Sequence, residues 1–464
     1  MTAIDVVVMA AGKGTRMKSS MPKVLQPLAG RAMVQHVAMT AAALGARHRI
    51  FITGYGAEQV EALLRQSNPD ASLGFARQEP QLGTGHAVMQ ALPHLPDDGV
   101  MLVLSGDVPL TSVATLQRLT QACAHQHLAL LTVSPPDPSG YGRVVRDAGG
   151  AVRAIVEQKD ASEAQKKITE VYSGIMAAPT HLMRAWLARL DNRNAQSEYY
   201  LTDVVAKAVA DGVPVVTVDC PDLSEVAGVN SPAQLAELER LYQRRQAEQL
   251  MAQGVRLLDP ARFDLRGELH CGQDVEIDVN CIFEGRVVLG YGVRVGAHCV
   301  LADCQIAAWA QILPFTYIEG QAQGVQVGAG ARVGPYARLR PGTHLGPEVH
   351  IGNFVEVKNS RLGAGSKANH LAYVGDTEMG SQVNFGAGSI TANYDGVNKH
   401  QTIIEDQVHV GSNCVIVAPV RLGSGGTIGG GSTITKDTPE QALTVARAKQ
   451  MSVNNWKRPS KKKS

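Results

Sequence analysis

The chain has 464 residues, of which 44% are hydrophobic and 19% charged, so it is a globular protein large enough for two or three domains. Its formal net charge of +2 does not favour long-range attraction to nucleic acid or to acidic membranes. The seven cysteines are scattered without a C-x-x-C pair, which argues against a zinc site or a disulfide framework. No apolar run is long enough to span a membrane and no signal-peptide pattern opens the chain, so we expect a cytoplasmic protein with reduced thiols.

The first half of the chain alternates strand-like and helix-like segments. This alternation predicts an α/β domain with a largely parallel sheet, in which ligands bind beyond the carboxyl ends of the strands. The predicted strands cover residues 4–9, 50–53, 100–104, 128–133 and 215–218, and predicted helices at 33–43 and 113–124 lie between them.

The loop after the first predicted strand reads MAAGKGTRMKSSMPK, residues 9–23. A glycine-rich loop in this place usually holds phosphate, because its exposed backbone N–H groups can point at the anion. The loop matches neither the dinucleotide-binding fingerprint nor the P-loop. It also carries three cations, Lys13, Arg16 and Lys23, and the loop alone leaves open which phosphate compound it would bind.

Asp107, in MLVLSGDVPL, follows the end of the predicted strand at 100–104. Magnesium takes one or two protein oxygens together with phosphates and water, so a carboxylate here suits a metal ligand. The alternative is a turn or helix-cap residue, because Thr111 and Ser112 follow and open a predicted helix. The residues alone leave these two roles open.

The pattern of the sequence changes after about residue 265. A helix that starts at Ser231 and ends near Gly254 precedes this change and is interpreted as a connector. Aliphatic residues, many followed by glycine, then recur every six positions, a period typical of a hexapeptide β-helix. Insertions at 320–324 and 391–399 interrupt the period and predict loops. The repeats run through Leu289, Val295, Leu301; Val327, Val333, Leu339, Leu345, Ile351, Val357; and Ile416, Leu422, Ile428, Ile434.

AAGKGTRM at residues 10–17, with Pro22 and Lys23, resembles the signature of sugar-1-phosphate nucleotidyltransferases. Together with KANHLAYVGD (367–376) and GAGSITANYDG (386–396), it resembles the bacterial bifunctional N-acetylglucosamine-1-phosphate uridyltransferase / glucosamine-1-phosphate acetyltransferases nearly end to end. The resemblance implies a Rossmann-like α/β nucleotidyltransferase domain with a mostly parallel sheet, followed by a left-handed parallel β-helix. The expected divisions are 1–230, a linker helix at 231–254, the β-helix at 255–437 and a tail at 438–464.

The resemblance implies that UTP and N-acetylglucosamine 1-phosphate meet in the first domain. Arg16 and Lys23 are the expected catalytic cations, and Asp107 and Asn230 the expected Mg²⁺ ligands. Tyr172 stands where the family often has asparagine, so its hydroxyl or its backbone would have to replace that contact. The remaining expected nucleotide- and sugar-binding residues are Ala10, Ala11, Gly12, Gln78, Gln81, Gly83, Thr84, Gly142 and Glu157.

The resemblance implies a second site in the β-helix, where acetyl-CoA acetylates glucosamine 1-phosphate. His370 is the expected base, because an imidazole can accept a proton near neutral pH. Without the surrounding motif, any one of the 14 histidines is better interpreted as a satisfied or surface residue. The expected sugar-phosphate ligands are Arg340, Lys358, Tyr373 and Asn384, and those for acetyl-CoA are Asn393, Tyr394, Lys399, Ser412, Gly430 (often alanine in the family) and Arg447.

Two alternatives to a bifunctional enzyme follow from the same domains. The β-helix could serve only to assemble a uridyltransferase into a homotrimer, the assembly that such β-helices favour. The whole chain could instead be a non-catalytic regulatory subunit. The intact Arg16, Lys23, Asp107, Asn230 and His370 argue against the regulatory alternative.

Overall fold

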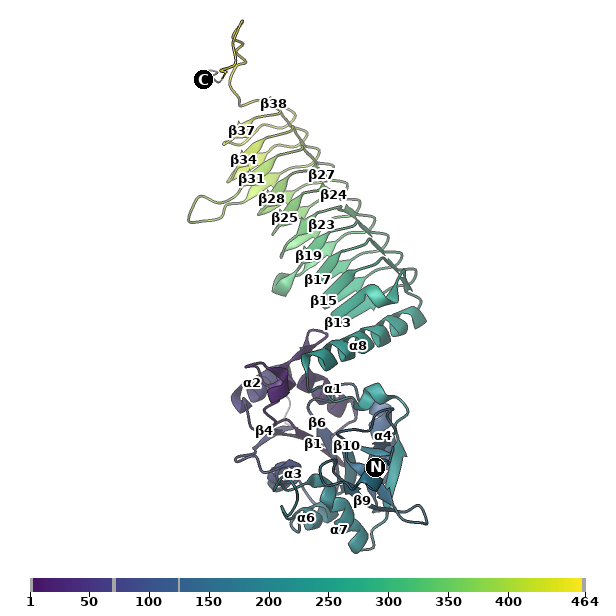
Figure 1. Cartoon of the computed structure of the whole chain (residues 1–464). Coiled ribbons are helices and arrows are strands. Elements are labelled where there is room, and N and C mark those ends of the chain that lie inside the picture. Colours follow the sequence, from purple (N-terminus) through teal and green to yellow (C-terminus); the bar gives the residue numbers. More distant parts are fainter. Residues whose placement is uncertain (1–2, 69–71, 124–125, 461–464) are drawn as a thin grey trace. The chain divides into compact units, whose positions relative to one another are not determined.

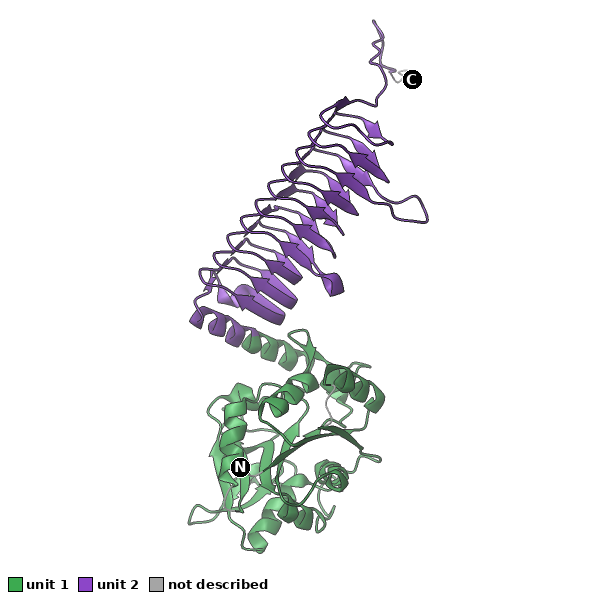
Figure 2. Cartoon of the chain, turned by 180° about the vertical axis from the view of Figure 1, so that it is seen from behind, with its two compact units in different colours: residues 1–242 green, residues 243–464 purple. Residues whose placement is uncertain are grey.

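The computed structural model describes residues 3–68, 72–123 and 126–460. The chain forms two compact units, residues 1–242 and 243–464 (Figure 2). The point of division lies inside helix α8 (Pro232–Ala252), where the sequence predicts a linker helix. The finer divisions at residues 230, 254 and 437 stay predictions, and the last four residues of the expected tail lie outside the described residues.

A mixed, mainly parallel sheet forms the centre of the first unit, which confirms the predicted α/β fold. Its strand order is β11-β7-β10-β6-β1-β4-β5, and a hairpin of β8 and β9 joins β10. Strand β10 runs antiparallel to both of its neighbours, β6 and β7, while the other pairs along this order are parallel. The strands are β1 (Ile4–Met9), β4 (His48–Thr53), β5 (Leu73–Arg77), β6 (Val100–Ser105), β7 (Leu128–Val133), β8 (Arg143–Arg146), β9 (Val152–Val156), β10 (Val171–Pro179) and β11 (Val215–Asp219).

Helices cover both faces of this sheet. The alternation along β1 shows why, since Val6 and Val8 join one hydrophobic cluster and Val7 joins another on the opposite face. The helix predicted at 113–124 ends at Ala122 in the structure, and residue 124 lies outside the described residues. The helices are α1 (Met33–Ala43), α2 (Ala57–Ser67), α3 (Thr84–Ala91), α4 (Val113–Ala122), α5 (Glu163–Lys166), α6 (Thr180–Leu187) and α7 (Val204–Ala210).

Parallel pairing brings several loops to one edge of the sheet. Met9 at the end of β1 lies opposite Ser105 at the end of β6 and opposite Ile52 on β4. The glycine-rich loop after β1 and the segment that holds Asp107 therefore leave the sheet side by side, at the edge where ligands bind in such folds.

The second unit is a parallel β-helix, whose coils stack one on the next (Figure 1). Its strands form three ladders, two of which are continuous through the long strands β13 (Phe263–Cys271), β15 (Cys281–Leu289) and β17 (Val300–Ile306). The first ladder contains β12 (Arg256–Leu257), β14 (Glu276–Ile277), β16 (Arg294–Val295), β18 (Gln311–Ile312), β21 (Arg332–Val333), β24 (His350–Asn353), β27 (Lys367–His370), β30 (Asn384–Phe385), β33 (His409–Val410), β36 (Thr427–Ile428) and β38 (Leu443–Thr444).

The other two ladders supply the remaining faces of the β-helix. One contains β20 (Val325–Val327), β23 (Thr343–Leu345), β26 (Arg361–Leu362), β29 (Thr377–Met379), β32 (Thr402–Ile404) and β35 (Val420–Leu422). The other contains β19 (Tyr317–Glu319), β22 (Arg338–Leu339), β25 (Glu356–Lys358), β28 (Tyr373–Gly375), β31 (Ile390–Ala392), β34 (Val415–Val417) and β37 (Thr433–Ile434).

The residues of the six-residue period form one continuous core, as the sequence predicts. Leu289, Val295, Ile351 and Ile434 are all 2% exposed or less. One insertion forms a short 3₁₀ helix, η7 (Gln321–Gln323), and the other, at 391–399, joins β31 to β32. Both interruptions therefore leave the regular coils, one as a short 3₁₀ helix and one as a loop, and such insertions are a usual place for ligand contacts in a solenoid.

One corner of the β-helix carries a stack of aromatic rings on successive coils. His298, Phe315, Tyr336 and Phe354 lie one above the next, with ring centroids 4.8, 4.9 and 5.4 Å apart. All four have positive φ, a conformation that costs a bulky residue roughly 1–3 kcal/mol. The coil geometry imposes this conformation, and stacking of the rings offsets part of the cost.

Helix α8 closes one end of the β-helix core. The buried Gln243 side chain accepts a hydrogen bond from the backbone N–H of Leu265 and donates one to its carbonyl. Ala247 and Leu250 pack on the first coil, so the open end of the core is capped, as solenoids require. In the described part of the chain no helix is long and apolar enough to cross a membrane.

Candidate active sites

Four of the predicted site residues meet at the carboxyl edge of the first sheet. Arg16 lies on the short 3₁₀ helix η1 (Thr15–Met17), and Lys23 begins the second one, η2 (Lys23–Leu25). The Lys23 ammonium forms an ion pair with Oδ2 of Asp107 and donates to Oδ1 of Asn230 at 3.2 Å. Arg16 donates to the same Asn230 oxygen at 2.8 Å, so the two cations share this oxygen as an acceptor.

Asp107 lies in the turn that follows β6 and is not a helix cap. Ser112 caps helix α4 instead, since its hydroxyl accepts a hydrogen bond from the backbone N–H of Thr115 at 3.1 Å. The Asp107 carboxylate accepts a second hydrogen bond, from the Ser105 hydroxyl at 2.7 Å, and its backbone carbonyl accepts one from Val229 at 3.0 Å. The backbone contact brings Asn230 beside Asp107, although 123 positions separate them.

A cavity of about 320 Å³ opens at Lys23 and Asp107, whereas Arg16 and Asn230 are not among its lining residues. Its volume is at the lower end of the range for small-molecule sites. Two lining residues that sequence reasoning missed are Ser105 and Glu198; the position of Ser105, two residues before Asp107 at the end of β6, could have indicated it. The cavity brings together the predicted residues Ala10, Ala11, Gly12, Lys23, Gln78, Gln81, Gly83, Thr84 and Asp107.

Two glutamines hold the loops that shape this cavity. Gln81 Nε2 donates to the Ala11 carbonyl at 2.5 Å, which ties the second glycine-rich loop to the first. Gln78 Nε2 donates to the Gly83 carbonyl at 2.9 Å. Gly83 has φ near 110°, and a side chain there would clash with the backbone of Tyr199, so the loop approaches its neighbour as only glycine allows.

Gly142 and Glu157 lie together, but neither of them lines this cavity. A Cβ atom on Gly142 would lie 3.7 Å from both carboxylate oxygens of Glu157. Glu157 accepts a hydrogen bond from the Thr202 hydroxyl at 3.0 Å, and its burial raises its pKa above the ordinary value. Tyr172 donates from its backbone N–H to the Gly142 carbonyl at 2.9 Å, while its buried hydroxyl has no partner among the described residues.

The donor set around Lys23 fits a divalent cation. Asp107 and Asn230 offer one carboxylate oxygen and one amide oxygen. The Lys23 ammonium contacts both, so these two oxygens already bind one positively charged group. Among the described residues no cluster of three or more His, Cys, Asp or Glu side chains forms a closed metal site. Magnesium needs only one or two protein oxygens when phosphates complete its shell. The third cation of the loop, Lys13, lies over the ring of Tyr55 instead.

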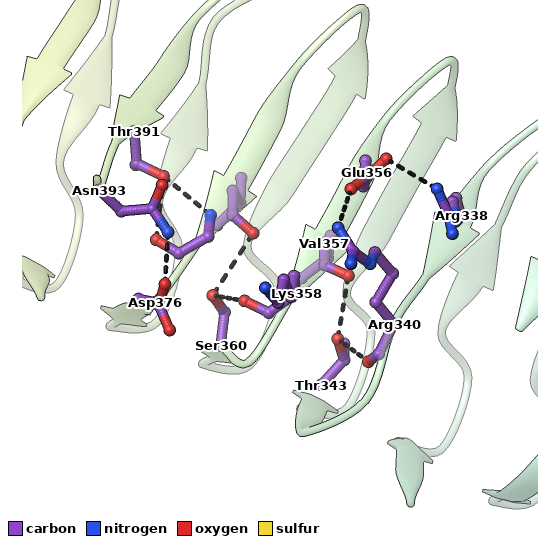
Figure 3. A network of polar contacts seen from close by, with 12 residues as sticks. Arg338, Arg340, Thr343, Glu356, Val357, Lys358, Ser360, Asp376, Thr391 and Asn393 are labelled. Atoms are coloured by element: carbon purple, nitrogen blue, oxygen red, sulfur yellow. Dashed lines mark hydrogen bonds and ion pairs between the residues drawn. The ribbon is translucent and has the colours of Figure 1, made fainter. Parts of the chain in front are cut away.

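In the β-helix, two predicted phosphate ligands lie on neighbouring coils. Arg340 donates to Oε1 of Glu356 at 2.8 Å, and Arg338 contacts the other oxygen at 3.6 Å (Figure 3). Lys358 lies two residues after Glu356 on β25 and therefore points to the same side of the ladder. Sequence reasoning missed Glu356, which the alternation in FVEVKNS could have indicated.

A second lysine approaches Lys358. The Lys399 ammonium beside it lowers the pKa of Lys358, and partial burial and Arg340 add to the same shift. Three cations therefore gather on this side of the β-helix, Arg340, Lys358 and Lys399, an arrangement that attracts a phosphate dianion.

The inserted loop at 391–399 is anchored at its base. The side-chain amide of Asn393 donates to Oδ2 of Asp376, while Asn359 donates to Oδ1 at 2.5 Å (Figure 3 shows the first contact). Tyr394 pairs with Lys399 as an antiparallel bridge, and its hydroxyl donates to the Gly396 carbonyl. The loop therefore has a fixed base and an exposed tip.

The remaining predicted residues for acetyl-CoA lie further along the β-helix. Arg447 donates to the Gly430 carbonyl at 2.5 Å. A Cβ on Gly430 would lie 3.3 Å from the Ser412 carbonyl oxygen, so these two residues are neighbours on successive coils.

His370 ends strand β27 on the first ladder, and its ring is exposed. Nδ1 of this ring lies 2.9 Å from Oδ1 of Asn353 on the preceding coil. Tyr373 follows beyond the corner on β28, with its ring over Gly375, and Asn384 lies on the next coil of the same ladder as His370. The ring is therefore accessible to a substrate, as a base requires.

Comparisons with known proteins agree with this architecture. A family model described as a MobA-like NTP transferase domain matches residues 6–256, and a bacterial transferase hexapeptide model of six repeats matches residues 324–359. The bifunctional protein GlmU of Albidiferax ferrireducens is 65% identical over 466 residues, covering 99% of this chain and 100% of that protein. Proteins of the same name from Paracidovorax citrulli and Azoarcus sp. are 64% and 57% identical, again over 99% of this chain and 99% and 100% of theirs. The chain therefore belongs to the family of bifunctional GlmU proteins, the uridyltransferase–acetyltransferases that its motifs resemble.

Proposed function

We propose that the two sites divide the synthesis of UDP-N-acetylglucosamine between them. The β-helix transfers the acetyl group of acetyl-CoA to the amine of glucosamine 1-phosphate. The first unit then transfers the uridylyl group of UTP to the product. Membership of a bifunctional family supports two reactions in one chain, and the two separate clusters of functional side chains support one reaction in each unit.

In the uridylyl transfer, a phosphate oxygen of N-acetylglucosamine 1-phosphate attacks the α-phosphorus of UTP. A new P–O bond forms, and the bond from the α-phosphorus to the bridging oxygen breaks, which releases pyrophosphate. Arg16 and Lys23 neutralise charge as it moves from the nucleophile to the leaving group, and such positioning and charge stabilisation provide most of the catalysis. Asp107 and Asn230 would hold Mg²⁺, which supplies further neutralisation of the phosphates.

The sugar and the base of the nucleotide have separate candidate contacts. Gln78, Gln81 and Thr84 offer amide and hydroxyl groups at one side of the cavity, suited to the edge of uracil. Glu157 offers a carboxylate to a sugar hydroxyl, and the Gly142 backbone lies within reach of it. Tyr172 supports this subsite through the backbone, because its N–H holds the Gly142 carbonyl.

In the acetyl transfer, the sugar amine attacks the thioester carbonyl carbon. The new C–N bond forms as the C–S bond breaks, and His370 accepts the proton that the nitrogen loses and returns it to the departing thiolate of coenzyme A. Arg340, Lys358 and Lys399 would hold the phosphate, with Tyr373 and Asn384 as polar contacts. Asn393, Tyr394, Ser412, Gly430 and Arg447 would contact acetyl-CoA.

The main observation in support of one reaction in each unit is the contact of Lys23 with both Asp107 and Asn230 at the carboxyl edge of the first sheet. The exposed His370 lies far from these residues along the chain. The test uses two assays on the purified chain. With UTP, Mg²⁺ and N-acetylglucosamine 1-phosphate it should release pyrophosphate, and with glucosamine 1-phosphate and acetyl-CoA it should release a free thiol.

Two variants separate the sites in these assays. His370→Ala should lose thiol release and keep pyrophosphate release, and Lys23→Ala should do the reverse. His409→Ala, which removes an exposed imidazole on β33, is the matched control. Pyrophosphate release without thiol release from the unaltered chain would favour a β-helix used only for assembly, and neither activity would favour a regulatory subunit.

The chain also has a surface suited to the homotrimer that such β-helices favour. Phe315, Tyr336 and Phe354 of the stacked corner are each about half exposed, and their rings form a continuous apolar ridge. In a closed cyclic assembly the same ridge of each copy would be covered. The mass in solution, measured by light scattering, should be three times that of the chain, and Tyr336→Arg should reduce it to the monomer mass.

A further inference from the structure

The side chain of Asn353 contacts the ring of His370 at the end of two paired strands. Asn353 on β24 and His370 on β27 are register partners in the first ladder. Their side chains therefore leave neighbouring coils in parallel, and Oδ1 of Asn353 lies 2.9 Å from Nδ1 of His370. This distance is that of an ordinary N–H···O hydrogen bond.

The chemistry of the two groups fixes the direction of this hydrogen bond. An amide oxygen can only accept, so the proton must be on Nδ1 of His370. A neutral imidazole has one ring proton, and its other nitrogen then carries a free lone pair. The contact with Asn353 therefore leaves Nε2 as the nitrogen that can accept a proton.

The residues around the ring show that the partner of His370 is an uncharged amide and not a carboxylate. The ionisable residues on the strands paired with β27, and on β27 itself, are His350 on β24 and Lys367. Beyond the corner lie Glu356 and Lys358 on β25 and Tyr373 on β28. Asn384 on β30 is neutral. Among the described residues no carboxylate hydrogen bonds to His370, so an uncharged amide alone orients its ring.

We propose that Asn353 is a positioning residue for acetyl transfer: it holds His370 in the tautomer and orientation in which Nε2 faces the substrate amine. Asn353 touches neither substrate nor reacting atoms. The inference rests on the proposed role of His370 as the base. A neutral partner fixes the ring but stabilises its charged form less than a carboxylate would, so the base returns its proton more readily to the leaving thiolate.

The test compares Asn353→Ala and Asn353→Asp in the acetyl-transfer assay over a range of pH. Asn353→Ala should lower kcat about 10- to 100-fold with little change in KM, because an unsupported ring samples unproductive orientations. Asn353→Asp should keep more activity but shift the acidic limb of the pH profile to higher pH, because a carboxylate stabilises the imidazolium. Asn369→Ala, which removes a neighbouring asparagine on β27, is the matched control.

Pyrophosphate release in the same samples and the thermal unfolding midpoint show that each variant is folded. If Asn353→Ala does not fold, the pH profile of Asn353→Asp still tests the positioning role. A kcat for Asn353→Ala within about twofold of normal, an unmoved pH profile for Asn353→Asp, or a loss seen only in KM would each overturn the proposal. His370→Ala distinguishes failure of the proposed base from failure of the positioning role. If His370→Ala keeps acetyl transfer, His370 is not the base. If His370→Ala loses acetyl transfer while both Asn353 variants behave normally, only the positioning role is refuted.

Discussion

The two units assemble their sites from sequence in opposite ways. In the α/β unit, Lys23 and Asp107 are 84 positions apart, and Arg16 and Asn230 are 214 apart. In the β-helix, the contacts from Asn353 to His370 and from Asp376 to Asn393 each span 17 positions, about one coil. The solenoid therefore places functional groups through local register, whereas the sheet must close long stretches of chain first.

The sites also differ in how far they enclose their ligands. The first has a cavity of about 320 Å³ lined by the glycine-rich loops. In the second, Tyr394 is 63% exposed and His370 is open to solvent. A recessed site strengthens each charge interaction relative to an exposed surface, because less water screens it, so single charge changes should have larger effects in the α/β unit.

The largest expected effect comes from removing the charge of Asp107. Asp107→Asn should lower kcat for pyrophosphate release about 10²- to 10³-fold, because Lys23 and the proposed Mg²⁺ ion would lose their common counter-charge. Steady-state kinetics at several Mg²⁺ concentrations would measure it, and added Mg²⁺ should restore part of the loss. Acetyl transfer should be unchanged.

Asp97→Asn is the matched control for that variant, since it removes a carboxylate paired with Arg184 at 2.8 Å, outside the cavity. If both variants lowered pyrophosphate release alike, the special position of Asp107 would be refuted. If Asp107→Asn also abolished acetyl transfer, the separation of the two sites would be refuted.

A smaller effect should appear in the β-helix at alkaline pH. Because Lys399 lowers the pKa of Lys358, Lys358 loses its proton at a lower pH than an ordinary lysine as the pH rises. The KM for glucosamine 1-phosphate should then rise about tenfold from neutral to alkaline pH, as one charged contact to the phosphate is lost. Measurement of KM in steps of pH would show where the increase begins.

Lys399→Met sharpens this prediction. Without the neighbouring cation the pKa of Lys358 moves back towards its ordinary value, so the increase in KM should begin at a higher pH, although the KM at neutral pH is larger. Lys436→Met, near the end of the β-helix, should leave both values unchanged. An onset that does not move in Lys399→Met would show that the two lysines are not coupled.

The same contrast explains what the sequence could predict. The β-helix core was predictable residue by residue, because a period of six records which side chains point inwards. In the α/β unit the alternation of elements predicted the sheet and its binding edge, but strand β10 was not predicted, since its sequence VYSGIMAAP has glycine and alanine in place of a β-branched run. Neither Glu198 nor Asn353 could be found from spacing, because their roles depend on contacts that only the folded chain creates.

The next smaller effect is expected on the KM for N-acetylglucosamine 1-phosphate and concerns Glu157. Burial raises the pKa of Glu157, so on acidification it becomes protonated at a higher pH than an exposed carboxyl. The KM for N-acetylglucosamine 1-phosphate should therefore rise about fivefold as the pH falls through that value, because a hydrogen-bond acceptor for the sugar is lost. Glu157→Gln should show the raised KM at all pH values, and a pH dependence that survives in this variant would assign the titration to another group.

The smallest effect on kinetics is expected from Gly430→Ala, which tests whether the acetyl-CoA site in the β-helix tolerates one added methyl group. The added Cβ would lie 3.3 Å from the Ser412 carbonyl oxygen, so the coil must shift by only a few tenths of an ångström. The Gly430 carbonyl that accepts from Arg447 is retained. The KM for acetyl-CoA should therefore change by less than about twofold, as for most substitutions outside a packed core. A change as large as that from Asp107→Asn would mean that the acetyl-CoA track is as tightly enclosed as the nucleotide cavity, and the contrast between the two units would fail.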